Sequence, residues 1–460
     1  MKVLHLNTHC SGGSYECAAL LCAALAEQGI ESRLLSKNSQ QPEGHRPLLD
    51  RVIRRLYVSL STEPWHGTRR LLSPPASEHL RGVDVVHLHT VADWFDVPVW
   101  LQTLPRHIGV VISLHDMWHF TGGCFLYRGC DRYTSENDPC DSCPILRWPA
   151  NRVLAGAAYS RKLRAYRKCG ARMVASSHWL AELADRSAIS KVCGGVRVIP
   201  PGIDTTVFKP HDKELCRKQL GLPADAFVVV TGGASLTDEN KNVPWLLEQL
   251  SALPDLDGII ILAFGEGAVP IPGGLGVRFT GGIRDRRDLA RLLAAADVFV
   301  SASLMETYGL TLTEAMACGT PVVAFRLGGI PEAAPDGQAA ILCPPHDGAA
   351  LIEAITKLRN SPQIRQRLGN LAHETAHIRN TASSFARAFA QLYRECVSSR
   401  EESQRKLSRE CGTLCLARRR GCFFMLELMG CRTKMEVKVP LSMHLSDTPS
   451  GRCIGLFCRQ

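Results

Sequence analysis

The sequence contains no apolar run long enough to cross a membrane. A membrane-spanning helix needs roughly 18 to 20 consecutive apolar residues, and none of the 460 residues begins such a stretch. The first residues, Met1 to Asn7, lack the apolar core of a secretory signal peptide and resemble a short strand that enters a glycine turn. We therefore expect the protein to stay in the cytoplasm.

The body of the chain also lacks the basic surface, interleaved with aromatic residues, that is typical of nucleic-acid binders. The formal net charge is +10, but residues 398–460 hold twelve Lys or Arg against six Asp or Glu and so supply +6 of it. The remaining mild excess suits anionic small molecules or an anionic membrane surface. We expect no nucleic-acid partner, although four clustered cysteines and the basic tail leave a zinc-stabilised nucleic-acid binder as a weak alternative.

The nineteen cysteines do not form the framework of a secreted disulfide-rich protein, because they are scattered through apolar positions and no signal precedes them. Most are expected to be reduced. Seven lie between Cys396 and the end of the chain, at spacings that match no metal motif.

Hydrophobic residues make up 45% of the chain and charged residues 21%, which is the composition of a globular protein with room for two cores. Short β-branched runs alternate with amphipathic segments of helical length, such as Tyr15–Gln28, and this alternation predicts parallel sheets covered by helices on both faces. The expected strands are Val3–Asn7, Ser32–Leu35, Val83–His89, Val110–Leu114, Met173–Ser176, Val196–Ile199, Phe227–Thr231, Ile259–Phe264, Val277–Phe279, Val298–Ser301 and Val322–Phe325. We predict an α/β protein with two doubly wound, Rossmann-like domains whose ligands bind in the cleft between them.

The most informative segment runs from Glu306 to Ala324, between two expected strands. It passes through a glycine turn, opens a helix at about Leu310 and places a second carboxylate, Glu314, inside that helix. A helix N-terminus suits a diphosphate, and a neighbouring carboxylate can accept hydrogen bonds from ribose hydroxyls. Alone, either glutamate would more often be an ordinary helical residue.

The whole segment resembles the Glu-x7-Glu signature of the family-4 retaining glycosyltransferases, which have the two-domain GT-B architecture. Stretches from Pro200, Gly265 and Gly328 resemble the same family in the expected order. The resemblance implies that Glu306 contacts hydroxyls of the donor sugar, that Glu314 holds the nucleotide ribose and that the amides of Gly309 and Leu310 face the diphosphate.

Relatives carry an arginine and a lysine on the first loop of the second domain. Here Lys241 matches the lysine, but small residues stand where the arginine is expected. Either Lys241 acts with backbone amides and Ser235, or an arginine such as Arg284 reaches the diphosphate. A lone loop lysine is usually just solvated, and only its place in this chain makes Lys241 a candidate.

In the first domain, Gly12 and Gly13 lie between a strand and a helix, where paired glycines allow close approach of a ligand. Given the resemblance, they would face the donor diphosphate and the acceptor. His115 ends another expected strand and is followed by Asp116, a pair that relatives also carry. We rank His115 as catalytic above four histidines that are more often structural or merely exposed: His9, His87, His89 and His119.

Cys124, Cys130, Cys140 and Cys143 fall within twenty residues. Four thiolates so close together can form a structural zinc site, although their spacing matches no named zinc finger. The alternative is four unliganded thiols. Such a zinc would fix an acceptor loop and take no part in catalysis, for which we expect no cofactor.

The resemblance implies a hexosyltransferase that moves a sugar from a nucleoside diphosphate sugar to a glycan or lipid-linked acceptor with retention, as in bacterial exopolysaccharide, lipopolysaccharide or colanic-acid-type assembly. Membrane contact would be peripheral, at the inner face. The alternatives are a sugar-nucleotide epimerase, which the signature disfavours, and a non-catalytic glycan-binding or scaffold protein with a degenerate site. The expected domains are an acceptor-side domain (1–194), a donor domain (195–375), a C-terminal helix (376–397) and an irregular Cys/Arg-rich, poorly ordered tail (398–460).

Overall fold

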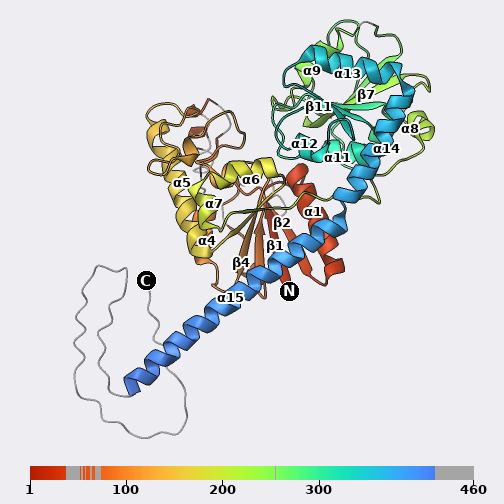
Figure 1. Ribbon diagram of the computed structural model, residues 1–460. Coiled ribbons are helices and arrows are strands. Elements are labelled where there is room, and N and C mark those ends of the chain that lie inside the picture. The colour runs from red at the N-terminus through yellow and green to blue at the C-terminus, as the bar shows by residue number, and fades with distance from the viewer. Residues whose placement is uncertain are drawn as a thin grey trace. The chain divides into compact units, whose positions relative to one another are not determined.

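The computed structural model of the chain (Figure 1) describes residues 1–37, 52, 55–56, 59–62, 65–67, 74–253 and 255–419. These residues form two six-stranded sheets in which all paired strands are parallel, with the orders β2-β1-β3-β4-β5-β6 and β12-β11-β10-β7-β8-β9. The strand order reverses direction between β1 and β3 in the first sheet and between β10 and β7 in the second, which is the doubly wound arrangement. The prediction of two Rossmann-like α/β domains is confirmed.

Helices cover both faces of the first sheet. Because successive side chains of a strand point to opposite faces, neighbouring residues pack in different cores. Leu4 and Leu6 pack in one core with helices α4, α5 and α6, whereas Val3 packs in a second core with α1 and α15. The elements of this domain are β1 (Lys2–Asn7), α1 (Gly13–Leu25), η1 (Ala26–Gln28), β2 (Glu31–Ser36), η2 (Ser77–Leu80), β3 (Val85–Leu88), α4 (Val97–Thr103), β4 (Gly109–Leu114), η3 (Trp118–Phe120), η4 (Arg132–Thr134), α5 (Ala150–Cys169), β5 (Arg172–Ala175), α6 (His178–Asp185), α7 (Ala188–Val192) and β6 (Val196–Val198).

The second sheet is enclosed in the same way. Val228 and Val230 face one core with α10 and α11, and Val229 faces another with α9 and α13. The elements are α8 (Lys213–Gln219), β7 (Phe227–Ser235), α9 (Val243–Leu250), β8 (Ile259–Glu266), β9 (Val277–Gly281), α10 (Arg286–Ala295), β10 (Val298–Ser301), α11 (Leu310–Ala317), β11 (Val322–Phe325), α12 (Ile330–Ala333), β12 (Ala340–Cys343), α13 (Gly348–Asn360) and α14 (Pro362–Arg379).

Two strand assignments differ from the sequence-based expectation. The strand at Val196–Val198 was expected to open the second domain, but β6 pairs with β5, from Met173↔Val196 to Ala175↔Val198. The boundary at 194/195 is therefore wrong, and the first sheet ends after Val198. The strand β12 was not expected, and its four residues extend the second sheet beyond β11.

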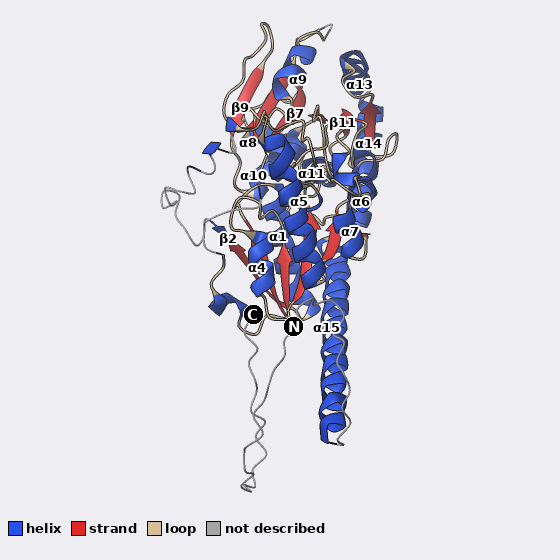
Figure 2. Cartoon of the chain, turned by 90° about the vertical axis from the view of Figure 1, so that its left-hand side faces the viewer, coloured by secondary structure: helices blue, strands red, loops and turns tan. Residues whose placement is uncertain are grey.

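The C-terminal helical region also differs from the expected single helix at 376–397. It consists of two helices, α14 and α15 (Ala382–Arg419). Figure 2 shows α15 as one long, uninterrupted helix. Residues 398–419, expected to be irregular, thus continue α15, whereas the rest of the predicted tail, 420–460, lies outside the described residues.

The helix α15 returns to the first domain. Phe385, Phe389 and Tyr393 of α15 are buried against Val3 and Val111 of the first sheet. No helix among the described residues is both long and apolar enough to span a membrane.

Candidate active site

The loop between β10 and α11 is built around Gly309. This residue has a φ of 99°, a conformation that costs most other residues free energy, and a Cβ at this position would meet Leu312 Cδ1 at 3.0 Å. Gly309 is the N-cap of α11, and no side chain caps that helix. The first amides of α11, from Leu310 onward, are therefore without an intrahelical partner and available to an anionic ligand.

Lys241 and Glu306 form a contact between the two loops that the sequence analysis singled out. Lys241 Nζ donates to Glu306 Oε1 at 2.6 Å, and the two side chains are 26% and 13% exposed. Burial acts to lower the pKa of Lys241, but the charge and hydrogen bond of Glu306 outweigh it and raise the pKa above its usual value. Lys241 is therefore a cation at neutral pH.

The neighbouring residues fix this pair in place. Asn240 Nδ2 donates to the carbonyl of Met305 at 2.9 Å, and the amide of Leu304 donates to the carbonyl of Asn240 at 2.8 Å. A Cβ at position 233 would lie 3.3 Å from Lys241 Cε, so the small residue Gly233 leaves room for the lysine. Gly233, one of the small residues that stand where an arginine was expected, thus has a packing role next to Lys241.

Glu314 is paired with an arginine that the sequence analysis missed. The Arg286 guanidinium at the start of α10 donates to Glu314 Oε1, while Arg284, the candidate suggested from sequence, is exposed. Glu314 is 2% exposed, and its burial raises the pKa to about 7 although Arg286 acts to lower it. Arg286 also lies 3.7 Å from Glu16 of α1 and 4.8 Å above the ring of Phe208.

These partners could not be found from local patterns. Arg286 lies 28 residues before Glu314, and Glu16 belongs to the other domain. The only available signal was the basic cluster Arg284, Arg286 and Arg287 just before an amphipathic helix.

The predicted donor residues Gly12, Gly13 and Ser235 have less defined surroundings. Gly12 is the N-cap of α1 with a φ of 89°, and a Cβ at Gly12 or Gly13 would meet no atom within 4 Å, so this turn faces open space. Ser235 Oγ is within hydrogen-bonding distance of Thr237 Oγ1, at 3.0 Å, and accepts from the Thr237 amide. A contact of any of the three with a donor remains a prediction.

His115 follows β4 and lies in the same group of loops. Its carbonyl accepts from Thr307 Oγ1 at 3.3 Å, one residue from Glu306, and its ring atom Nε2 is 3.0 Å from His89 Nδ1. Burial lowers the pKa of His115 to about 4, so the ring is neutral at pH 7. The Asp116 carboxylate accepts from the backbone amide of Trp118 at 2.7 Å.

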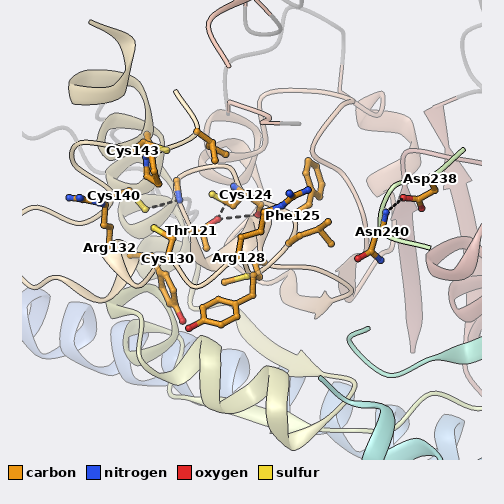
Figure 3. A pocket seen from close by; sticks show the side chains of 18 residues that line it. Thr121, Cys124, Phe125, Arg128, Cys130, Arg132, Cys140, Cys143, Asp238 and Asn240 are labelled. Atoms are coloured by element: carbon orange, nitrogen blue, oxygen red, sulfur yellow. Dashed lines mark hydrogen bonds between the residues drawn. The ribbon is translucent and has the colours of Figure 1, made fainter. Parts of the chain in front are cut away.

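The four clustered cysteines line one cavity of about 270 Å³ (Figure 3). Cys140 Sγ accepts from the amide of Gly122 at 3.1 Å. A hydrogen bond with Cys124, and those from the amides of Ile145 and Leu146, lower the pKa of Cys143 to about 7. Among the described residues, no three of these four sulfur atoms lie within 4.8 Å of one another, so the thiols share a cavity without forming a closed ligand set.

Two family models match the chain. The model of Glycosyltransferase Family 4 matches residues 11–207, and that of Glycosyl transferases group 1 matches residues 226–361. Both sheets of the chain are therefore similar in sequence to glycosyltransferases. The two matched segments correspond to the two sheets, and the second contains Lys241, Arg286, Glu306 and Glu314.

Individual similar proteins agree with this assignment. D-inositol 3-phosphate glycosyltransferase of Saccharomonospora viridis is 31% identical over 226 residues, which are 44% of this chain and 51% of that protein, so the chain spans about half the length of the curated relatives it matches. Among solved structures, sucrose-phosphate synthase from Thermosynechococcus elongatus has a TM-score of 0.62 at 21% identity and covers 86% of this chain and 99% of its own. Anabaena HepE in complex with UDP-glucose has a TM-score of 0.55 at 19% identity, and the match covers 87% of this chain and 100% of the HepE chain. At these identities the structures establish the fold.

Proposed function

We propose that the protein transfers a hexosyl group from a nucleoside diphosphate sugar to a lipid-linked or polysaccharide acceptor, with retention at the anomeric carbon. The observation that carries the proposal is the position of a half-buried cation, Lys241, against Glu306, which lies on the loop that leads into the uncapped N-terminus of α11. In this proposal the positive charge of Lys241 and the α11 N-terminus stabilises the departing diphosphate, and no metal ion or other cofactor takes part.

Each residue has a defined part in this proposal. Lys241 and the amides of Gly309 and Leu310 stabilise the leaving diphosphate, and Glu306 accepts hydrogen bonds from hydroxyls of the donor sugar. Glu314, held by Arg286, accepts from the ribose hydroxyls. Because Arg286 lies in the second domain and contacts Glu16 of the first, it also links the nucleotide site to α1.

The proposed donor and the proposed acceptor rest on different observations. A nucleotide-sugar donor is supported by the similar Anabaena structures, which were solved with UDP and with UDP-glucose. The acceptor class rests on the family resemblance, and it would place the enzyme in the cytoplasm with peripheral contact at the inner membrane face.

The direct test is nucleotide binding. Purified protein is screened by calorimetry against UDP, GDP, ADP and their sugar conjugates, with Lys241→Ala and Glu314→Ala in parallel. Binding of one nucleotide that both substitutions weaken supports the donor site and names the donor base. Binding of none would favour a glycan-binding scaffold with a degenerate site.

Glu314→Gln is expected to weaken nucleotide binding by roughly 10- to 100-fold at pH 8, the range for losing a hydrogen bond to a charged group. Since the pKa of Glu314 is raised to about 7, wild-type affinity should increase from pH 6 to pH 8 as the carboxylate forms. The glutamine variant should lack that increment. The exposed Glu353→Gln serves as control, and equal pH dependence in all three proteins would contradict the role of Glu314.

We also propose that Cys124, Cys130, Cys140 and Cys143 hold a structural zinc, which would draw the four sulfurs together into the cavity that they line. The amides directed at Cys143 act to lower the pKa of its thiol, whereas burial raises the pKa of Cys140 to about 12 despite the amide of Gly122. Elemental analysis of purified protein should find about one zinc per chain, retained in Cys169→Ser and lost in Cys143→Ser. Zinc-free wild-type protein that is folded would rule this out.

A further inference from the structure

Four buried histidines lie next to the candidate catalytic residue His115, in the core of the first domain. His5 lies on β1 and His87 on β3, while His89 follows β3, and these three are 0 to 1% exposed. His119 is also buried, and His115 lies at the edge of the group, half-buried. So many buried imidazoles require an account of where each ring nitrogen finds its partner.

Three of the rings form one chain of hydrogen bonds. His5 Nδ1 is 3.2 Å from His89 Nε2, and His89 Nδ1 is 3.0 Å from His115 Nε2. The rings of His5 and His89, and those of His89 and His115, are stacked, with centroids 5.5 and 5.3 Å apart. Each contact needs one protonated and one bare nitrogen, so the tautomer of one ring fixes that of the next.

His87 and His119 do not belong to this chain. His87 uses both ring nitrogens elsewhere, with Tyr393 Oη at 2.7 Å and Ser113 Oγ at 2.8 Å. His119 Nε2 donates to the carbonyl of His89 at 3.1 Å, and its other nitrogen faces Tyr166 Oη. A metal ion held by His5, His87 and His89, whose ligand atoms lie within 4.8 Å of one another, would have to break these bonds.

His5, at the inner end of this chain of hydrogen bonds, determines the direction in which the protons are donated. His5 Nε2 is fully buried and has no hydrogen-bond partner in the described part of the protein. Orphaned buried N–H groups are rarer in proteins than under-satisfied acceptors, so the proton of His5 belongs on Nδ1, where it can be donated to His89 Nε2. His89 must then carry its own proton on Nδ1 and donate it to His115 Nε2.

We propose that His5 and His89 hold His115 as the tautomer with its proton on Nδ1, so that His115 presents a neutral N–H donor to the bound sugar. No contact of Nδ1 is recorded within the described residues, nor is it among the buried unpartnered atoms, so this nitrogen is open to solvent. Its hydrogen-bond partner is an oxygen acceptor, such as a sugar hydroxyl. His5 and His89 are positioning residues and do not touch the substrate.

Only the identity of the ligand rests on the proposed function, because the tautomer is a property of the free protein. Low pKa values support a neutral state of the hydrogen-bonded histidines, since burial lowers the pKa of His5 to about 3 and that of His115 to about 4. His115 on this account acts as a fixed hydrogen-bond donor and not as a general base at Nδ1.

The test is nitrogen-15 NMR of protein labelled at histidine, in which protonated and bare ring nitrogens have distinct shifts. The His115 signals are identified as those lost in His115→Asn. We expect Nδ1 of His115 to be protonated in the wild type and in His87→Phe, a matched control that removes a buried ring 4.1 Å from His89 but leaves the chain intact. In His5→Phe the chain loses its inner donor, and His115 should become a mixture of tautomers.

Donor turnover provides a second measurement. His5→Phe should lower kcat/KM by about 2- to 10-fold, the range for one hydrogen bond, with less change in His87→Phe. A wild-type His115 protonated on Nε2 would overturn the proposal even if the enzyme is fully active. Metal-shifted histidine signals that disappear in His87→Phe would overturn it in favour of a metal site. If no nucleotide binds but Nδ1 is protonated, the proposed function fails and the tautomer assignment stands.

Discussion

Lys241→Ala should lower donor turnover, measured as transfer or as hydrolysis of the sugar nucleotide, by roughly 10²- to 10³-fold, the range reported for removing one preorganised stabilising group. Lys241 is a half-buried cation 2.6 Å from Glu306, next to the N-terminus of α11. Its loss removes charge stabilisation from the leaving diphosphate and leaves the Glu306 carboxylate without its cation, so negative charge near the diphosphate increases.

Two controls separate these causes. Lys357→Ala removes an exposed lysine of α13 in the same domain and should be active. If Lys241 served only to neutralise Glu306, then Glu306→Gln would restore activity to Lys241→Ala. We expect no such restoration, because both side chains would contact the donor, and a non-additive double-mutant cycle would measure their coupling. Full activity of Lys241→Ala itself would remove the basis of the proposed function.

The free energy of unfolding should fall steeply when the pH drops below about 6.5. Burial lowers the pKa of His5, His87, His89, His115 and His119, so the folded state keeps these rings neutral while the unfolded chain protonates them. A histidine with a lowered folded-state pKa contributes stability above its unfolded pKa, and that stability is lost as the pH falls.

Two carboxyl groups act in the opposite direction. Burial raises the pKa of Asp116 and of Glu314 to about 7, so each is more readily protonated in the folded state, and stability from them increases as the pH falls. On unfolding, the five histidines take up about five protons and the two carboxyl groups release about two, so the protein takes up about three protons net. The free energy of unfolding therefore changes by about 4 kcal/mol per pH unit. At that slope, a total stability of about 5–15 kcal/mol is lost about 1.3 to 3.8 pH units below pH 6.5, so acid unfolding is expected between about pH 3 and 5.

Urea titrations followed by circular dichroism at several pH values measure this slope. Replacing one buried histidine, as in His119→Gln, should reduce the slope by about one proton even if it lowers stability overall. The exposed His107→Gln should leave it unchanged. A flat stability profile between pH 7 and pH 5 would show that the buried rings titrate normally.

The parts of this protein that sequence could predict are those with a local signal. Eleven strands were expected, and each has a counterpart in the structure, because buried parallel strands are short apolar runs bounded by turns. Glu306 and Glu314 were predicted through a resemblance carried by one continuous segment, and Lys241 through its place on the first loop of the second domain. The structure brings Lys241 and Glu306 together, and their roles stay predictions.

The parts that sequence missed depend on contacts between distant residues. Nothing local distinguishes a strand that ends the first sheet from one that begins the second, so β6 was placed in the wrong domain. Arg286 was missed in favour of Arg284 because a guanidinium's partner is set by where α10 and α11 meet. The order of protons along His5, His89 and His115 likewise depends on three-dimensional neighbours.

The position of α15 has a consequence for how the protein is made. Domains usually fold in the order in which they leave the ribosome. Here Phe385, Phe389 and Tyr393 complete the apolar face that Val3 and Val111 form and that α1 covers only in part, so the rest of that face stays uncovered until nearly 400 residues have been synthesised. The second domain, whose sheet and covering helices span 213–379, can be finished first. The nascent first domain should therefore be the portion most in need of a chaperone.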